Sequence, residues 1–148
     1  MENREKILQA FIETPTTYKI AVSDNSMLPK SMKNKKEVTF IVKPPVLSVL
    51  AKCGIPVGKI PKELMDADKD INLEDAVKYT KEMAEAFAIL AHGKTTEFPE
   101  WYIPFILNNV TARELFILFK EVALKTQSSF FLNSFQIASI SNPMTMSQ

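Results

Sequence analysis

The stretch that decides the fold is TARELFILFKEVALKTQSSFFLNSFQIASI, residues 111–140. It is the most apolar part of the chain, and we expect the other segments to cover most of it. The pattern predicts two consecutive helices. Thr111 suits the N-cap of the first helix, and Glu114 lies three residues on, where it would complete a capping box. Ser128 or Ser129 can cap the second helix in the same way.

The first of these helices, expected over residues 111–127, has two apolar sides. The residues on its broad apolar face, with Phe116 at the edge, are Leu115, Leu118, Phe119, Val122 and Ala123. The opposite side is charged, except where Ile117 and Leu124 form a narrow apolar line between two charged strips. In the second helix Phe130 and Ile137 likewise project away from the main apolar face. Two explanations remain open: helices buried on two sides, or an exposed surface for a partner or a second copy.

Composition narrows the class of protein. The chain of 148 residues is near the usual size of one domain, so we expect a single domain over 1–148. The formal net charge of +1 gives no global attraction to nucleic acid or to an anionic membrane. One cysteine excludes an intramolecular disulfide and fits a reducing compartment. No apolar run approaches the roughly 20 residues of a membrane helix, and we see no secretion signal. We expect a soluble cytoplasmic protein.

The N-terminal part combines a helix with a β element. Residues 1–15 contain a short amphipathic helix that could dock on the body or be mobile. Residues 16–22 and 37–42 alternate apolar and polar positions, which predicts two strands. Between them lies a flexible basic loop, residues 23–36, which is too long for a tight hairpin. This loop is either a solvated loop or a contact for an acidic partner or nucleic acid, and it lacks interleaved aromatics for base stacking. Its basic residues are Lys30, Lys33, Lys35 and Lys36.

We expect a helical body over residues 44–140, followed by a frayed tail over 141–148. Pro44–Pro45 suits the start of an apolar helix, and Gly54 is expected to end it. A long amphipathic helix is predicted from about Asn72 to His92, with Val77 on its apolar face and Gly93 closing it. The fold class predicted is mainly α: a helical bundle of about five helices with a short two-stranded β element near the N-terminus.

The segment 97–109 carries an aromatic cluster formed by Trp101, Tyr102, Phe105 and Ile106. Pro104 would break a long helix, so we expect a kink or two short pieces here. The cluster either packs against the C-terminal helices or holds a small ligand.

We find no catalytic, metal-binding or cofactor-binding motif and predict a protein that is not an enzyme. Cys53 is expected to be packed in the core, because a reactive thiolate would need a histidine or a helix N-terminus. With His92 as the only histidine, zinc sites and nucleophilic triads are hard to build. Three acids, Asp66, Asp68 and Asp70, match the start of a calcium loop, but the glycine required at its sixth position is replaced by Ile71.

Three segments together resemble the tail assembly chaperones of tailed phages and prophages over about residues 37–140. They are VTFIVKPPVLSVLAKCG, a strand leading into a proline-started helix; the long helix EDAVKYTKEMAEAFAILA; and TARELFILFKEV followed by SSFFLNSF. The lysine-rich loop 23–36 is a departure from that pattern. The resemblance implies a small, mostly helical cytoplasmic protein that accompanies a tape measure protein during tail assembly.

The resemblance and the apolar pattern lead to one expectation about partners. We predict a protein client, the tape measure protein, and a homo-oligomer, with no membrane, metal or nucleic-acid partner. Contact would use helix-in-groove packing of anchors seven residues apart. The predicted contact residues are Ile117, Leu124, Phe130 and Ile137. Two alternatives remain: a nucleic-acid-associated regulator that uses the lysine-rich loop, and a ligand-binding helical domain built on the aromatic cluster.

Overall fold

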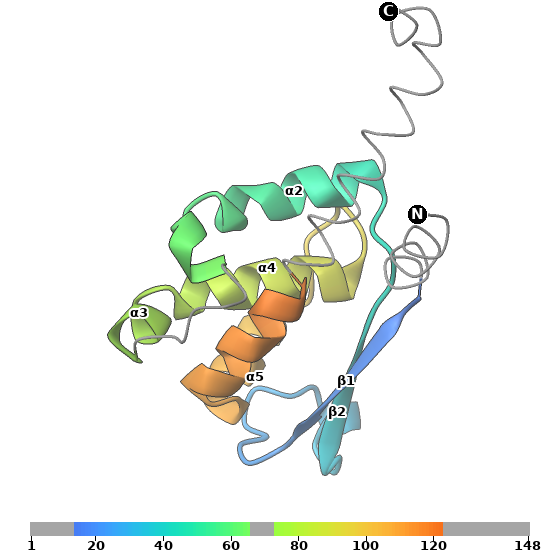
Figure 1. Cartoon of the computed structure of the whole chain (residues 1–148). Helices are drawn as coiled ribbons and strands as arrows, with labels where there is room; N and C mark the ends of the chain where they lie inside the picture. Colours follow the sequence, from blue (N-terminus) through green and yellow to red (C-terminus); the bar gives the residue numbers. More distant parts are fainter. Residues whose placement is uncertain (1–13, 66–72, 123–148) are drawn as a thin grey trace, which may run out of the picture.

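The computed structural model describes residues 14–65 and 73–122 (Figure 1). Predictions about the N-terminal helix, the three aspartates of the calcium-like run, the second C-terminal helix and the tail lie outside these residues. The elements in order are β1 (Thr16–Ala21), η1 (Lys30–Met32), β2 (Glu37–Val42), α2 (Leu47–Val57), η2 (Lys62–Met65), α3 (Leu73–Lys78), α4 (Thr80–His92) and α5 (Tyr102–Asn109). Residues 112–122 are also helical.

The two predicted strands form an antiparallel pair within the same chain, in the register Tyr18↔Phe40 and Ile20↔Val38. Successive side chains of a strand point to opposite faces. The inner face, which carries Tyr18, Ile20, Val38, Phe40 and Val42, is buried, and the positions between them are exposed. The alternation in the sequence therefore predicted both strands and the face that each one buries.

Helix α4 is the central element of the fold. Seven of its thirteen residues are buried, and α2, α5, α3 and β2 all contact it. In Figure 1 α2 runs along one side of α4, and the two strands lie on the side of α4 that faces away from α2. The apolar stretch 111–140 was expected to take this organising place; of it, residues 111–122 are described, and Leu115, Phe116, Phe119 and Val122 belong to the same core as α4.

The long helix predicted over 72–92 is divided in two. Tyr79, with φ −111° and ψ 17°, separates α3 from α4, and the hydroxyl of Thr80 donates to the carbonyl of Val77 at 3.0 Å. The break changes the helical phase, so that Val77, expected on the core face, is 59% exposed. Gly93 ends α4 as predicted, in the left-handed conformation with φ 70°.

Helix α2 differs from its prediction at both ends. It begins at Leu47 instead of Pro44–Pro45 and continues through Gly54 to Val57, with Gly58 as its C-cap. The buried face explains the extension, because Val49, Leu50, Cys53 and Pro56 recur at helical spacing. A glycine can remain helical where packing favours it, so the stop signal at Gly54 was overridden.

Helix α5 accommodates Pro104 without the predicted kink or division. The helix begins at Tyr102, which places Pro104 in the first turn, where a backbone N–H has no intrahelical partner to lose. The aromatic cluster packs against the sheet: Phe40 contacts the rings of Trp101, Tyr102 and Phe105 at centroid distances of 6.0, 5.2 and 6.0 Å. Phe105 is fully buried.

The described residues are mostly helical with a two-stranded antiparallel sheet, which confirms the predicted class. Four α-helices have both ends within these residues, slightly fewer than the predicted count of about five, and residues 112–122 are helical as well. None of the helices in 14–65 and 73–122 has the length and apolar character that crossing a membrane requires.

Candidate interaction surface

The helical segment 112–122 begins with the predicted capping box. The backbone N–H of Glu114 donates to the Thr111 hydroxyl at 3.1 Å, and the Thr111 N–H donates to the Glu114 carboxylate at 3.3 Å. The Thr111 hydroxyl also donates to that carboxylate at 2.8 Å. These reciprocal bonds satisfy N–H groups that a helix start leaves unpaired. They fix where the helix begins and therefore which of its residues face outward.

Ile117 is the predicted contact residue that lies within the described part of the chain. It is 48% exposed, whereas Leu115, Phe116, Phe119 and Val122 are all buried. The segment therefore packs through one face and leaves an isoleucine exposed on the other, which is the second of the two explanations that the sequence left open. The other three predicted contacts, Leu124, Phe130 and Ile137, lie outside the described residues.

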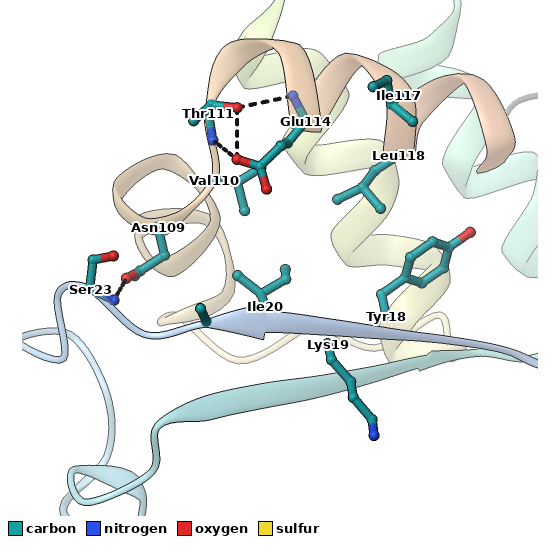
Figure 2. Close-up of a pocket in the computed structure, with 11 residues that line it drawn as sticks. Tyr18, Lys19, Ile20, Ser23, Asn109, Val110, Thr111, Glu114, Ile117 and Leu118 are labelled. Carbon is teal, nitrogen blue, oxygen red and sulfur yellow. Dashed lines mark hydrogen bonds between the residues drawn. The ribbon is translucent and has the colours of Figure 1, made fainter.

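Ile117 forms one wall of a groove that we call the β1 groove (Figure 2). The opposite wall is β1 from Tyr18 to Ala21, and the end is formed by Ser23, Asn109 and Val110. Leu118 and Ile20 point into the space between the walls, whereas Lys19 points away to the outer face of the sheet. The groove has a volume of about 550 Å³. Its apolar surface therefore comes from two elements that are almost a hundred residues apart in the sequence.

Asn109 holds the end of this groove together. Its side-chain oxygen accepts from the N–H groups of Ser23 and Asp24 at 2.7 and 2.8 Å. Its amide nitrogen donates to the carbonyls of Asp24 and Phe105, both at 3.0 Å. All four hydrogen-bonding positions of the asparagine amide are thus used. The result is a fixed connection between the loop after β1 and the last turn of α5.

Tyr18 connects the middle of β1 to the helical segment 112–122. Its hydroxyl donates to the carboxylate of Glu121 at 3.2 Å. Burial is the main cause that raises the pKa of the Tyr18 phenol, and the nearby negative charge of Glu121 and the hydrogen bond to it act in the same direction. The phenol therefore stays protonated and keeps donating at any physiological pH. This bond keeps the two walls of the β1 groove at a fixed separation.

The loop 23–36 carries the predicted basic patch. Lys30, Lys35 and Lys36 are exposed, but the Lys33 ammonium donates to the Ser26 carbonyl at 3.0 Å, and the Asn25 amide donates to the Lys33 carbonyl at 3.0 Å. Two further features shape the loop: the side chain of Leu28 is buried in the core, and η1 forms a turn within the basic run. Lys33 thus has an internal role that the sequence did not indicate.

Two reactive side chains, Cys53 and His92, lie where the sequence predicted, in the core and at the end of a helix. Cys53 is fully buried, and this burial raises the pKa of its thiol to about 12. His92 lies in the last turn of α4 with its Nε2 atom 3.1 Å from the Thr96 hydroxyl. Across residues 14–65 and 73–122, no three or more His, Cys, Asp or Glu side chains are grouped so that they could hold a metal ion.

Asn109 and the β1 groove were missed by sequence reasoning. The four hydrogen bonds of Asn109 include three to residues about 85 positions away. No local sequence pattern indicates such a contact, although an asparagine side chain at a helix end often forms hydrogen bonds to the backbone. The groove likewise depends on which face of β1 meets the helical segment 112–122.

Comparison of the chain with protein-family models, with curated proteins and with solved structures found no match.

Proposed function

We propose that this protein is a non-enzymatic, tail assembly chaperone-like protein of a phage or prophage, which binds a tape measure client or a second copy of itself in the cytoplasm. The observation that carries the proposal is the half-exposed Ile117, which stands on an otherwise charged helix face and forms a wall of the β1 groove. A chaperone for a long helical client needs adhesive apolar surface and no chemistry.

The energy available at this residue is modest and suits reversible binding. Burying the exposed half of an isoleucine side chain contributes about 1 kcal/mol, since full burial contributes about 1.5–3 kcal/mol. The flanking residues Arg113, Glu114 and Glu121 are exposed, so they would form the polar rim that interfaces usually carry. A binding site of this kind needs further anchors, and Leu124, Phe130 and Ile137 are the residues that the sequence offers.

The test replaces Ile117 by glutamate and compares it with Val77→Glu, a control on α3 that is 59% exposed and does not line the groove. We expect both variants to keep the circular dichroism and melting temperature of the parent. Light scattering should show lost self-association for Ile117→Glu alone, and co-expression of that variant with a tape measure protein should no longer yield a soluble complex.

Two outcomes would contradict the proposal. If Ile117→Glu unfolds as readily as Phe119→Glu, which introduces a charge at a fully buried position, then Ile117 belongs to the core. If both exposed variants associate like the parent, the surface has no adhesive role.

The exposure of Lys30, Lys35 and Lys36 favours one alternative function, a nucleic-acid-associated regulator that uses the basic loop. Such binding would weaken steeply as salt rises, because each phosphate contact releases a counterion. A gel-shift series at rising salt with the parent and with a variant that neutralises these three lysines separates this alternative from the assembly role.

A further inference from the structure

A second groove, which we call the β2 groove, follows the other edge of the sheet. Its walls come from the end of β2, residues 43–46, the last turn of α4 with residues 93–94, and Tyr102 of α5. Its volume is about 510 Å³. None of the residues that line the β1 groove lines this one. The two grooves are therefore separate surfaces on opposite edges of one small sheet.

The charged side chains that line the β2 groove are all positive. Lys43 and Lys94 are the charged side chains among its lining residues, and no aspartate or glutamate is among them. Both lysines are exposed, and neither forms an ion pair within the described part of the chain. Lys94 lies in a fixed turn, because the Lys52 ammonium donates to the carbonyls of Thr95 and Thr96 at 2.9 and 3.3 Å. The rim is therefore positively charged and held in place.

Beside these cations the β2 groove exposes apolar side chains. Ile41 is 48% exposed and Val46 is 64% exposed, and both line the groove. Large exposed apolar side chains that gather at a concave place mark a contact site more often than single scattered ones do. An occupant of this groove would therefore need apolar groups as well as negative charge.

The edge of β2 also offers unpaired backbone groups. The N–H of Val22 donates to the carbonyl of Lys36 at 2.9 Å, which makes these two residues a hydrogen-bonded pair at the end of the ladder. Hydrogen-bonded and non-hydrogen-bonded pairs alternate along an antiparallel ladder. In the register of this sheet, Thr39 and Ile41 then direct their N–H and C=O groups away from β1. Within residues 14–65 and 73–122 no hydrogen bond is formed to these outward groups.

From these three features we propose that the β2 groove binds an acidic, extended peptide segment of a partner protein, which adds as a third strand beside β2. The peptide main chain pairs with the outward groups of Thr39 and Ile41, which is the strand-addition mode of recognition. Its carboxylates meet Lys43 and Lys94, and its apolar side chains cover Ile41 and Val46. Free strand edges readily accept such a segment.

A peptide fits these features better than a nucleic acid does. Phosphates would be attracted to Lys43 and Lys94, but they have no N–H donors to offer the outward carbonyls of Thr39 and Ile41. Bases would need aromatic faces for stacking. Of the three aromatic rings that line this groove, Phe40 is buried, and those of Tyr102 and His92 pack edge-on against each other.

The test measures binding of fluorescein-labelled EVEVEVEV to the full chain by fluorescence anisotropy. We expect saturable binding of this peptide and none of KVKVKVKV. The peptide EVEVPVEV should bind much more weakly, because proline lacks the N–H that a ladder requires. Replacing both Lys43 and Lys94 by glutamate should weaken binding of EVEVEVEV by about tenfold or more, since two attractions become repulsions.

The matched control is Lys30→Glu with Lys35→Glu, which changes the net charge by the same amount in the loop 23–36. We expect this control, and Ile117→Glu, to bind EVEVEVEV as the parent does, with circular dichroism confirming that all variants are folded. Equal weakening by both lysine pairs would mean attraction by overall charge and would overturn the proposal. Absence of EVEVEVEV binding, unchanged binding of EVEVPVEV, or tighter binding of an oligothymidylate of similar length would overturn it as well.

Discussion

Replacing Asn109 by alanine should destabilise the protein far more than its place at a helix end suggests. The change removes four hydrogen bonds of 2.7–3.0 Å, of which three connect α5 to the loop after β1 and one lies within α5. A typical intramolecular hydrogen bond contributes about 0.5–1.5 kcal/mol net, and the groups left unpaired here are part-buried or exposed, so water can replace some of the bonds. We therefore expect a loss of about 2–3 kcal/mol.

Urea unfolding followed by circular dichroism measures this loss. With a denaturant dependence of about 1–3 kcal/mol per molar urea, the midpoint should fall by about 1–2 M. The matched control is Asn108→Ala, because Asn108 is also in the last turn of α5 but makes a single exposed bond, from its amide to the Pro104 carbonyl at 2.7 Å. Both variants gain the same helix propensity from alanine, so the difference between them isolates the contacts of Asn109.

Hydrogen exchange provides a second measurement on the same variant. In Asn109→Ala the amides of Ser23 and Asp24 should exchange faster than in the parent, because they lose their acceptor. The reasoning would be refuted if the two variants unfolded within about 0.5 kcal/mol of each other, which is the usual effect of a surface substitution. It would also be refuted if the Ser23 and Asp24 amides stayed protected.

Substitutions at Thr111, Cys53 and Phe40 test other parts of the fold. Thr111→Ala should cost about 1 kcal/mol through loss of the capping box, and Thr111→Ser should restore most of it; thermal unfolding of the three proteins compares them. Cys53 should not react with a thiol reagent until the protein unfolds. In this pH range the folded thiol keeps its proton while the unfolded thiol loses it, so the free energy of unfolding should fall as pH rises from 9.0 to about 12. Cys53→Ala should reduce that fall in urea unfolding at pH 8 and at about pH 10.5. Phe40→Ala should cost about 3–5 kcal/mol in urea unfolding, since it removes ring contacts to four other aromatic side chains, whereas the same change at the neighbouring exposed Ile41 should cost under about 1 kcal/mol.

The sequence predicted correctly those structural features that are determined by residues close together in the chain. The capping box of Thr111 and Glu114 is set by a spacing of three, and the left-handed conformation of Gly93 satisfies a helix end that its own turn creates. The burial of alternate residues in both strands follows from the pleat of a strand. Helical periodicity also placed Ile117 away from the main apolar face, although it left open whether that second side is exposed or buried.

The sequence did not predict those structural features that depend on packing between segments far apart in the chain. Gly54 is a local stop signal, but the burial of Pro56 against the body keeps α2 helical beyond it. The break at Tyr79 has no comparable sequence signal: neither a glycine nor a proline is near, and the division of the helix moved Val77 to the surface. The role of Asn109 depends on contacts across about 85 residues, so no periodicity contains it.

The small size of the sheet explains why both candidate surfaces lie where they do. The helices cover the inner face of the two-stranded sheet, and within residues 14–65 and 73–122 no further strand pairs with either of its edges. Free edges invite pairing with another chain, and lysines near an edge are one device that discourages it. In a parallel, in-register pairing Lys43, directly after β2, would repel the same residue of a second copy, but it would attract a strand that carries carboxylates. The charge that opposes uncontrolled self-pairing at β2 is therefore the charge that selects an acidic partner. In the β1 groove Lys19 points away to the outer face of the sheet, and Ile117 forms one wall. A partner of the β1 groove would therefore be held more by apolar contact than by attraction to a lysine.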